Sequence, residues 1–394
     1  MIGIDIVDIS KFSSKASSRF LEKLFAEDEL NYGFKKQNSL QTFAGIFAAK
    51  EAILKANNLN LAHILRKKIE IKHVDNRPIA FINNKEIRGS ISISHDGNYA
   101  IAICNMKDQY QMNINQEMKE IMPKRKSESH KGDYGRIAIL GGSSGMAGSV
   151  YMASLSAMRT GAGMAFILAP KSISEILQIK SNEQIIKEID CHNFYYSSEI
   201  VDQILDNIEG KDTLIIGPGM GKGEDLNKLI GEIITSTDID MVIDADGLNA
   251  ISKDLSILKS NNKIILTPHL GEFSRLTGLE IDKIKEDEES IARKFAKDND
   301  VVLVLKSDHT IVTDGLKFYK NEIGNPGMAT AGVGDVLTGV IASLMKRLEP
   351  FEAAKLGVYI HSLAGDIASE KLGEDSLIAT DVIENLSEAI KRLR

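Results

Sequence analysis

Short runs of hydrophobic residues alternate with stretches of helical period through the C-terminal two thirds of the chain. Six of these runs are rich in Ile, Val and Leu and end in Gly, Pro or a polar residue, which predicts buried parallel strands. They occupy residues 136–142, 164–170, 213–219, 241–247, 263–268 and 301–306. Strands that alternate with helices predict a doubly wound α/β sheet, in which ligands bind beyond the carboxyl ends of the strands.

Glycine-rich and polar segments follow these predicted strands. Residues 141–149 (GGSSGMAGS) and 217–223 (GPGMGKG) are glycine loops, which either wrap a phosphate or only make tight crossovers. Residues 269–273 (HLGEF) and 306–310 (KSDHT) place a histidine and a lysine at strand ends. A dinucleotide-binding Rossmann fingerprint fails, because the strand at 164–170 ends without the acidic residue that would hold a ribose hydroxyl.

A further glycine segment, GVGD at 332–335, stands directly before a predicted helix. The apolar residues of that helix recur at the spacing of a buried face: Val336, Leu337, Val340, Ile341, Leu344 and Met345. Gly332, Val333 and Gly334 are therefore expected at a helix N-terminus, where unpaired N–H groups and the helix dipole attract phosphate. Asp335 is either a charge beside bound phosphate or only a helix cap.

Several other polar residues also have two explanations at this point. A lone His269 is more often a satisfied polar residue than a catalyst, and Asp244 and Asp246 are also explained as turn formers. Their common position favours function, because several glycine loops and one helix-start aspartate all fall at predicted strand ends. This arrangement favours a nucleotide phosphate site.

Length, cysteine content and hydrophobic runs limit the class of protein. A chain of 394 residues predicts two domains, and 43% hydrophobic residues exclude wholesale disorder. Two distant cysteines, Cys104 and Cys191, cannot build a disulfide framework and favour a reducing compartment. No apolar run approaches membrane-spanning length, and the N-terminal MIGIDIVDI contains acidic residues, so it predicts a strand and not a signal peptide. We therefore expect a cytoplasmic protein.

Charge separates the chain into two parts. Residues 1–108 contain 16 Lys and Arg against 12 Asp and Glu, whereas residues 109–394 contain 32 against 43, and the net charge is −7. The basic residues are scattered and not interleaved with aromatic ones, which disfavours nucleic acid as a partner. The polar stretch 107–135 lacks a sustained apolar period, so we expect a linker, placed at 109–117, between domains 1–108 and 118–394.

Eight motifs follow one another in the C-terminal part: HKGDYGR, GAG, IGPGMG, VIDADGLNAI, LTPHLGEFSRL, VLVLK, GNPGMATAGVGDVLTG and GVYIHSLAGD. In this order they resemble the ADP- or ATP-dependent NAD(P)H-hydrate dehydratases of the ribokinase-like superfamily. The resemblance implies repair of a damaged cofactor, the 6S hydrate of NADH or NADPH, by nucleotide-driven dehydration. Phosphorylation turns the ring hydroxyl into a phosphate that can leave, and Asp335 would be the base that takes the hydroxyl proton. The N–H groups of Gly332, Val333 and Gly334 would form an anion hole for the transferred phosphoryl group, with Mg²⁺ bridging the nucleotide phosphates.

The same resemblance implies two sets of binding residues. The positions that would face the NAD(P)H hydrate are Ala162, Gly219, Gly221, His269 and Asp335. The positions that would surround ADP or ATP are Lys306, Ser307, Asp308, His309, Thr310 and Gly334. Ser307 departs from the family, which usually has glycine after the lysine, so the preferred nucleotide stays open. The alternatives are a ribokinase-like kinase of a small alcohol, such as a vitamin precursor, and a module that only binds.

The N-terminal part has a helical stripe interrupted by charge. In residues 41–56 the stripe consists of Phe43, Ile46, Phe47, Ile53 and Leu54, and Lys50 falls in its middle. Lys50 either snorkels from the stripe to solvent or has a function. Glu51 and Lys55 either form an ordinary i,i+4 ion pair or belong to a functional site. Asp5 lies in the predicted first strand, and residues 91–103 predict a hairpin with Asp96-Gly97 at its turn.

GIDIVDI, FAAKEAILKA and SISHD occur in this order, and they resemble the motifs of holo-acyl-carrier-protein synthases, which are small α+β phosphopantetheinyl transferases. The resemblance implies that Asp5 and Glu51 hold Mg²⁺ on the pyrophosphate of coenzyme A. It also implies that Lys50, Lys55 and His95 neutralise phosphate or assist attack by the serine of an acidic acyl carrier protein.

Departures from the transferase motifs leave a second explanation of the N-terminal part. Lys11 and Ile46 replace common arginines, and NNLNLAHILRKK replaces a glycine-rich loop. Transferase activity and a degenerate docking or oligomerisation module therefore both stay open. Both resemblances imply homo-oligomers.

Overall fold

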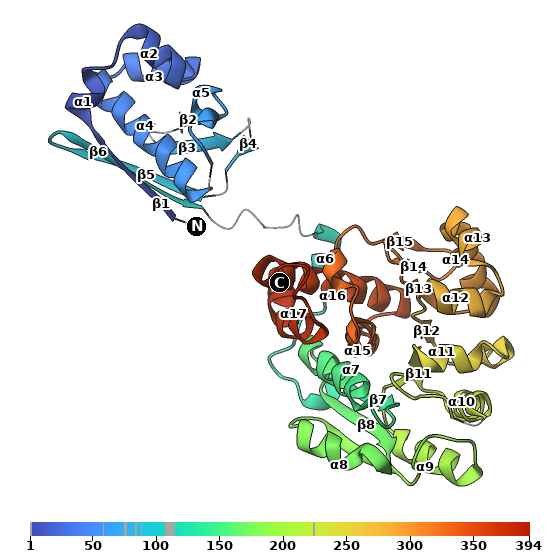
Figure 1. Cartoon of the computed structure of the whole chain (residues 1–394). Helices are drawn as coiled ribbons and strands as arrows, with labels where there is room; N and C mark the ends of the chain where they lie inside the picture. The colour runs from blue at the N-terminus through green and yellow to red at the C-terminus, as the bar shows by residue number, and fades with distance from the viewer. Residues whose placement is uncertain are drawn as a thin grey trace. The chain divides into compact units, whose positions relative to one another are not determined.

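The computed structural model of this chain contains two compact units, residues 1–113 and 114–394 (Figure 1). The residues it describes are 2–57, 59–74, 77–82, 85–87, 89–106, 115–223 and 225–394. The expected linker at 109–117 lies mostly outside the described residues, and its last two residues begin helix α6 (Gln116–Ile121). Among the helices of the described ranges, none is both long enough and apolar enough to cross a membrane.

The smaller unit combines helices with two antiparallel sheets. The first sheet has the order β1-β6-β5, and its strands are β1 (Ile2–Asp8), β5 (Gly89–Asp96) and β6 (Tyr99–Met106). The second has the order β2-β3-β4, with β2 (Ile69–Val74), β3 (Arg77–Ile82) and β4 (Lys85–Glu86). The helices are α1 (Ile9–Ser13), α2 (Ser18–Leu24), α3 (Glu27–Phe34), α4 (Ser39–Ala56) and α5 (Ala62–Leu65).

Helix α4 lies against one face of the β1-β6-β5 sheet. A Cβ atom on Gly3 of β1 would collide with the carbonyl of Ala52, so only glycine allows the strand to lie this close to the helix. The first strand, the central helix and the hairpin are where the sequence predicts them. The hairpin loop is Gly97-Asn98, one residue later than expected, and Gly97 has a φ of +54°.

The larger unit is built on a nine-stranded sheet of order β15-β14-β13-β12-β11-β10-β7-β8-β9. Seven strands are parallel: β7 (Arg136–Leu140), β8 (Met164–Pro170), β9 (Ile185–Ile189), β10 (Thr213–Ile216), β11 (Asp240–Ile243), β12 (Ile264–Leu266) and β13 (Val302–Leu305). The last two, β14 (Ile311–Thr313) and β15 (Phe318–Lys320), are antiparallel. The six predicted strands are confirmed, whereas β9, β14 and β15 were not predicted.

Helices cover both faces of this sheet (Figure 1). One layer contains α7 (Ala147–Thr160), α15 (Val333–Met345), α16 (Pro350–Leu372) and α17 (Ala379–Leu393). The other contains α9 (Ser198–Ile208), α10 (Leu226–Thr235), α11 (Asp246–Ile251), α12 (Leu270–Thr277) and α14 (Glu288–Asn299). The remaining helices are α8 (Lys171–Lys180) and α13 (Ile281–Glu286), with short 3₁₀ turns at Lys131–Tyr134, Leu255–Leu258 and Pro326–Met328.

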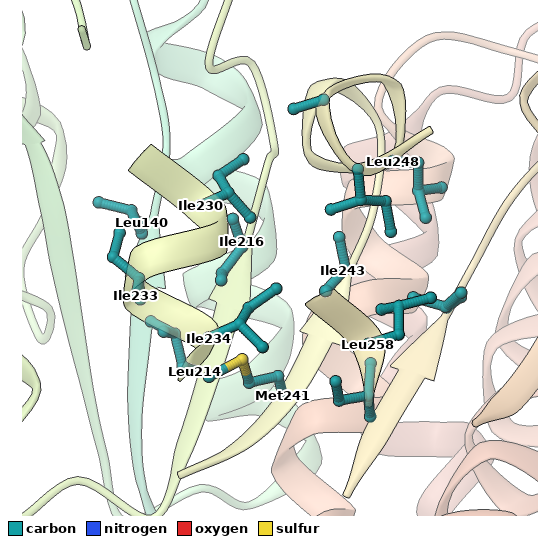
Figure 2. Packing of buried hydrophobic residues seen from close by; sticks show 14 of the residues in the cluster. Leu140, Leu214, Ile216, Ile230, Ile233, Ile234, Met241, Ile243, Leu248 and Leu258 are labelled. Atoms are coloured by element: carbon teal, nitrogen blue, oxygen red, sulfur yellow. The ribbon is translucent and has the colours of Figure 1, made fainter. Parts of the chain in front are cut away.

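The core between the sheet and its second helix layer is aliphatic. Figure 2 shows Ile216 and Ile243 of neighbouring strands packed against Ile230 of α10 and Leu248 of α11. All four side chains are fully buried. Such close packing holds the strand ends rigidly, and the polar segments that follow them form the candidate site.

Candidate functional site

The N-terminus of α15 is the centre of the candidate site. Gly332 is its N-cap, with φ +89°, and the helix begins at Val333 as the sequence predicts. The positive φ favours glycine at this position, and a Cβ atom there would also push aside the end of the Met152 side chain of α7. The N–H groups of this first turn have no partner within the helix and are available to an anion.

Asp335 lies in the first turn of this helix. Burial raises the pKa of its carboxyl to about 6, with further upward effects of Asp244 and Asp246 and downward effects of a hydrogen bond from Ser149 and the charge of Lys306. A carboxylate with a pKa near neutrality is mostly ionised at pH 7 and still binds a proton well. Asp335 therefore has the protonation behaviour of a general base.

A buried ion pair lies next to Asp335. Lys306, at the end of β13, places Nζ 2.9 Å from Oδ1 of Asp244, at the end of β11. The hydroxyl of Thr338 lies 2.8 Å from the other Asp244 oxygen and 3.0 Å from the carbonyl of Gly334. Burial alone would raise the pKa of Asp244, but Lys306 and the hydroxyl contacts outweigh it and lower that pKa. The pair thus ties two strand ends to the first turn of α15.

His269 caps helix α12. Its Nδ1 accepts hydrogen bonds from the N–H groups of Gly271 (3.0 Å) and Glu272 (3.3 Å), and Glu272 Oε2 accepts from the His269 N–H at 2.9 Å. Because Nδ1 is an acceptor, the neutral ring carries its proton on Nε2. Burial and the positive charge of Lys306 lower the pKa of His269, which keeps the ring neutral. Its backbone pairs with that of Lys306, so the two residues lie side by side at the strand ends.

The two glycine loops lie together beside Asp335. The Ser143 hydroxyl donates to the carbonyl of Gly219 at 2.9 Å, and the N–H of Gly221 donates to Asp246 Oδ2 at 2.8 Å. A Cβ atom on Gly219 would stand 3.0 Å from the Cβ of Ser149, the residue bonded to Asp335. Gly219 therefore lies beside Ser149, which contacts Asp335, and Gly221 lies beside Asp246.

Asp244 and Asp246 are separated by a backbone outlier. Ala245 has φ +50° and ψ −120°, a conformation that costs a non-glycine residue free energy. It directs Asp244 toward Lys306 and Asp246 toward the loop of Gly221. In the sequence these aspartates were explained either as turn formers or by function, and their contacts with Lys306 and Gly221 could not be predicted.

A cavity of about 940 Å³ opens beside the α15 N-terminus. Its lining includes every residue expected around a nucleotide: Lys306, Ser307, Asp308, His309, Thr310 and Gly334. His269 and Val333 also line it, and an apolar part is formed by Ile323, Met328, Leu337 and Val358. A pocket of this size with polar groups at one end suits a nucleotide, with the base in the apolar part and the phosphates at the helix end.

Three charged residues come together in the smaller unit. Lys55 Nζ lies 2.8 Å from Asp5 Oδ1 and 3.1 Å from the Ile4 carbonyl. Burial and the negative charge of Asp5 raise the pKa of Glu51, so the two carboxylates are near each other and repel. A divalent cation would relieve that repulsion, which fits Mg²⁺. No group of three or more His, Cys, Asp or Glu in the described ranges forms a complete protein-only metal site.

Family models match both parts of the chain. One described as NAD(P)H-hydrate dehydratase matches residues 137–388. The chain belongs to the NAD(P)H-hydrate dehydratase family. A second model, described as 4'-phosphopantetheinyl transferase superfamily, matches residues 1–104, so a transferase-like segment precedes the dehydratase-family segment.

Known relatives of the dehydratase family are similar to the larger unit. The bifunctional NAD(P)H-hydrate repair enzyme Nnr of Moorella thermoacetica is 38% identical over 277 residues, which cover 69% of this chain and 52% of the relative. The Nnr of Coxiella burnetii is 37% identical over 268 residues, covering 68% and 52%. The chain thus spans about half the length of the curated relatives it matches.

A solved structure of the family has the same fold. The ADP/ATP-dependent NAD(P)H-hydrate dehydratase of Bacillus subtilis, co-crystallised with ATP/Mg²⁺, is 26% identical with a TM-score of 0.62. The match covers 72% of this chain and all of that chain. The ribokinase-like fold expected for the larger unit is therefore confirmed.

One residue predicted from the dehydratase motifs is not at the site. Ala162 follows the C-terminus of α7 and precedes β8, so it lies at the amino edge of the sheet, opposite the edge that carries Asp335. It is buried, and its N–H donates to the Ala157 carbonyl. The GAG motif that contains it ends a helix, with Gly161 at φ +112°. The prediction that Ala162 faces a substrate is wrong in this structure.

Lys50 is the second residue whose predicted role the structure contradicts. Its side chain is 0% exposed, and Nζ lies 2.6 Å from Glu29 Oε2 and 2.8 Å from the Leu24 carbonyl. It neither snorkels to solvent nor reaches a phosphate on the surface.

His95 lies on β5, opposite Ala100, and is exposed.

Two polar residues beside the α15 N-terminus were not expected from sequence reasoning. His361 of α16 and Ser149 of α7 contact the α15 N-terminus, through Val333 and Asp335 respectively. His361 falls inside GVYIHSLAGD, one of the motifs that carry the resemblance, and Ser149 ends the glycine loop GGSSGMAGS. Their position within those motifs is the signal that could have identified them.

Proposed function

We propose that the larger unit dehydrates the 6S hydrate of NADH or NADPH at the expense of ADP or ATP. The observation that carries this proposal is the position of Asp335, whose pKa of about 6 suits a base, at a glycine-capped helix N-terminus beside a nucleotide-sized cavity. Membership of the dehydratase family supports it. Because both substrates are nucleotides of the cytoplasm, the proposed site of action is the cytoplasm.

The reaction begins with phosphoryl transfer. Asp335 takes the proton of the ring hydroxyl while the hydroxyl oxygen attacks the terminal phosphorus of the nucleotide. The bond between that phosphorus and the preceding phosphate breaks. The N–H groups of Gly332, Val333 and Gly334 stabilise the charge that develops on the phosphoryl oxygens. The ring then loses phosphate from one carbon and a proton from its neighbour, which forms the double bond. The products are NAD(P)H, inorganic phosphate and a nucleotide shortened by one phosphate.

The two substrates occupy different parts of the site. ADP or ATP lies in the cavity, with Lys306 and residues 307–310 around it. The nicotinamide ring approaches Asp335 from the side of the glycine loops, past Gly219, Gly221 and His269. A neutral His269 offers its Nε2–H as a hydrogen-bond donor to the ring substituents.

Mg²⁺ is expected with the nucleotide. The Bacillus subtilis relative was co-crystallised with ATP/Mg²⁺, and Mg²⁺ bound to phosphates and water needs only one or two carboxylates. Asp308 and Glu322 line the cavity and fit this role. A bound ion would neutralise phosphate charge, while Asp335 and the α15 N–H groups act on the reacting atoms.

One assay separates this function from the alternatives. The whole chain is incubated with the 6S hydrate of NADH and ADP or ATP, and the near-ultraviolet absorbance of the reduced nicotinamide is followed. Dehydration restores that absorbance, a small-alcohol kinase leaves a phosphorylated alcohol, and a binding module does neither. An Asp335→Asn variant should bind nucleotide and fail to restore the absorbance. Full activity of that variant would rule out the mechanism.

For the smaller unit we propose phosphopantetheine transfer from coenzyme A to an acidic acyl carrier protein. The proximity of Asp5, Glu51 and Lys55 supports it, with the two carboxylates holding Mg²⁺ and the lysine near the pyrophosphate. The same chain is incubated with coenzyme A, Mg²⁺ and apo carrier protein, and the mass of the carrier protein is measured. An unchanged mass would favour the docking or oligomerisation module, in keeping with the departures at Lys11 and Ile46.

We also infer that copies of the chain associate through the smaller unit. The face of its first sheet away from α4 carries exposed Ile4, Ile6, Ile101 and Ile103, and in the register Ile4 pairs with Ile103 and Ile6 with Ile101. Adjacent exposed isoleucines on a sheet favour a covering partner. Light scattering should give a mass above one chain for the parent, and a smaller mass for Ile6→Glu with Ile101→Glu. A monomeric parent would contradict the inference.

A further inference from the structure

His361 of helix α16 lies directly behind the anion hole. Its Nε2 is 3.0 Å from the carbonyl oxygen of Val333, and it lines the same cavity as Val333 and Gly334. The side chain is 6% exposed. It belongs to the motif GVYIHSLAGD, to which the proposed mechanism assigns no task.

The hydrogen bond fixes which nitrogen of His361 carries the proton. A carbonyl oxygen only accepts, so Nε2 is the donor and Nδ1 has no proton in the neutral ring. Burial lowers the pKa of His361 to about 4, and the charge of Lys306 acts in the same direction. The ring is therefore neutral at physiological pH and adds no charge to the phosphate site.

The geometry of the peptide group links this hydrogen bond to the anion hole. The Val333 carbonyl and the Gly334 N–H belong to one planar trans peptide unit, in which they point in opposite directions. Holding the carbonyl on the α16 side therefore directs the Gly334 N–H to the other side. Thr338 contacts the next carbonyl, that of Gly334, at 3.0 Å, so the following peptide unit is restrained as well.

We propose that His361 is a positioning residue that directs the Gly334 N–H at the transferred phosphoryl group by donating its Nε2–H to the Val333 carbonyl. The proposal rests on the proposed function of the larger unit and extends it to α16. It gives the buried ring a hydrogen-bond partner within a mostly apolar stretch of α16, where Val358, Ile360, Leu363 and Ala364 are buried.

Three substitutions separate positioning from packing. His361→Phe keeps the size of the ring and removes the donor, His361→Gln places an amide N–H close to the position of Nε2, and His361→Asn carries the same amide on a shorter side chain. Removing one donor from an oxyanion hole lowers kcat by about 10²–10³-fold, and misdirecting it should cost roughly 10–100-fold. We expect this loss in the Phe and Asn variants and near-parental kcat in the Gln variant.

Nucleotide binding supplies a second readout that does not depend on turnover. Calorimetry of the whole chain with ADP and with AMP reports the affinity added by the terminal phosphate. The Phe variant should keep AMP affinity within about twofold and lose most of the preference for ADP, while the Gln variant keeps it. Melting temperatures of all three variants show whether each one is folded.

The outcomes distinguish the inference from the function it rests on. A parental chain that prefers ADP to AMP but does not dehydrate the hydrate would end the proposed function, and the ADP preference of the variants would still decide the role of His361. A Phe variant with parental kcat and ADP preference would overturn the inference. Equal loss of AMP and ADP affinity would overturn it too, because it would show a packing role only.

Discussion

Lys306 forms its ion pair with Asp244, at 2.9 Å, while both residues adjoin Asp335. The negative charge of Asp244 raises the pKa of Asp335, whereas the positive charge of Lys306 lowers it. Burial then dominates and raises the pKa of Asp335 to about 6. A lysine without Asp244 would instead stabilise the ionised form of Asp335 and make it a weaker base. The ion pair thus adds to the effect of burial on the basicity of its neighbour.

Asp244→Asn tests this relationship. Loss of the carboxylate removes a charge that raises the pKa of Asp335 and leaves Lys306 unopposed, so that pKa should fall below 6. The acid limb of the pH–rate profile should move to lower pH and kcat should fall. Leaving one partner of a buried pair without its counter-charge should also cost about 3 kcal/mol of unfolding free energy.

Asp240→Asn is the matched control for that substitution. Asp240 begins the same strand, β11, at the opposite edge of the sheet, where it accepts a hydrogen bond from the Lys263 N–H at 3.2 Å. The pH–rate profile of the Asp240→Asn variant should coincide with that of the parent. An unchanged profile in Asp244→Asn would contradict the control of Asp335 by the ion pair.

The pH dependence of the parental reaction follows from the same carboxyl. The base must be ionised to accept the hydroxyl proton, so the rate should rise with pH up to about 6 and then level off. Below pH 6 the rate should fall about tenfold per pH unit. Steady-state rates at saturating nucleotide, measured from roughly pH 4.5 to 8, would give this pH–rate profile. A profile flat down to pH 5 would exclude Asp335 as the base.

Asp335→Asn should make the larger unit more stable while abolishing turnover. A carboxyl with a pKa near 6 when folded and 3.8 when unfolded binds more protons in the folded state, so stability is lost as pH rises through that window. At pH 7 the full penalty is present, about 3 kcal/mol for a shift of about two units. The Asn variant should therefore melt at higher temperature than the parent at pH 7 and at a similar temperature at pH 4. A lower melting temperature at pH 7 would contradict the raised pKa.

Hydrophobic patterning was enough to predict the frame of the larger unit and the start of α15. Runs such as 136–142 are buried on both faces, so their composition alone identifies strands. Strands β14 and β15 have three residues each, too few to show a period, and the IIKEI sequence of β9 contains two charged residues. β9 and β15 are the two edge strands of the sheet, where solvent permits polar residues, and β14 adjoins β15.

Side-chain roles were harder to predict than strands because they depend on contacts distant in sequence. Lys50 is buried because Glu29, 21 residues earlier, neutralises it. His361 acts on Val333, 28 residues earlier, through a hydrogen bond to the backbone. Ala162 lies within a motif shared with the dehydratases, yet its glycine neighbours serve to end a helix. A motif therefore marks a segment without showing which of its residues face the ligand.

Gly332→Ala should damage the anion hole. The residue has φ +89°, which strains alanine, so the N-cap should shift and move the first-turn N–H groups with it, while the end of the Met152 side chain turns away from the new Cβ atom. We expect kcat to fall at least about tenfold and stability to fall by about 1–3 kcal/mol. Gly210→Ala is the control, because Gly210 also has positive φ (+68°) but open space around it. The Gly210→Ala variant should lose about 1 kcal/mol of unfolding free energy through backbone strain and keep parental kcat.

Glu29→Gln tests the structural role of Lys50 in the smaller unit. The buried ammonium would lose its counter-charge, and burial already lowers the pKa of Lys50, so the free energy of unfolding should fall by about 3–5 kcal/mol. Adding Lys50→Met to that variant removes the unpaired charge and should recover a large part of the loss, as measured by chemical denaturation of the whole chain. Lys55→Met, on the same helix with an exposed side chain, should change stability by less than about 1 kcal/mol. If Lys50→Met alone abolished phosphopantetheine transfer without destabilising the unit, Lys50 would act at the ligand and its assignment to the core would be wrong.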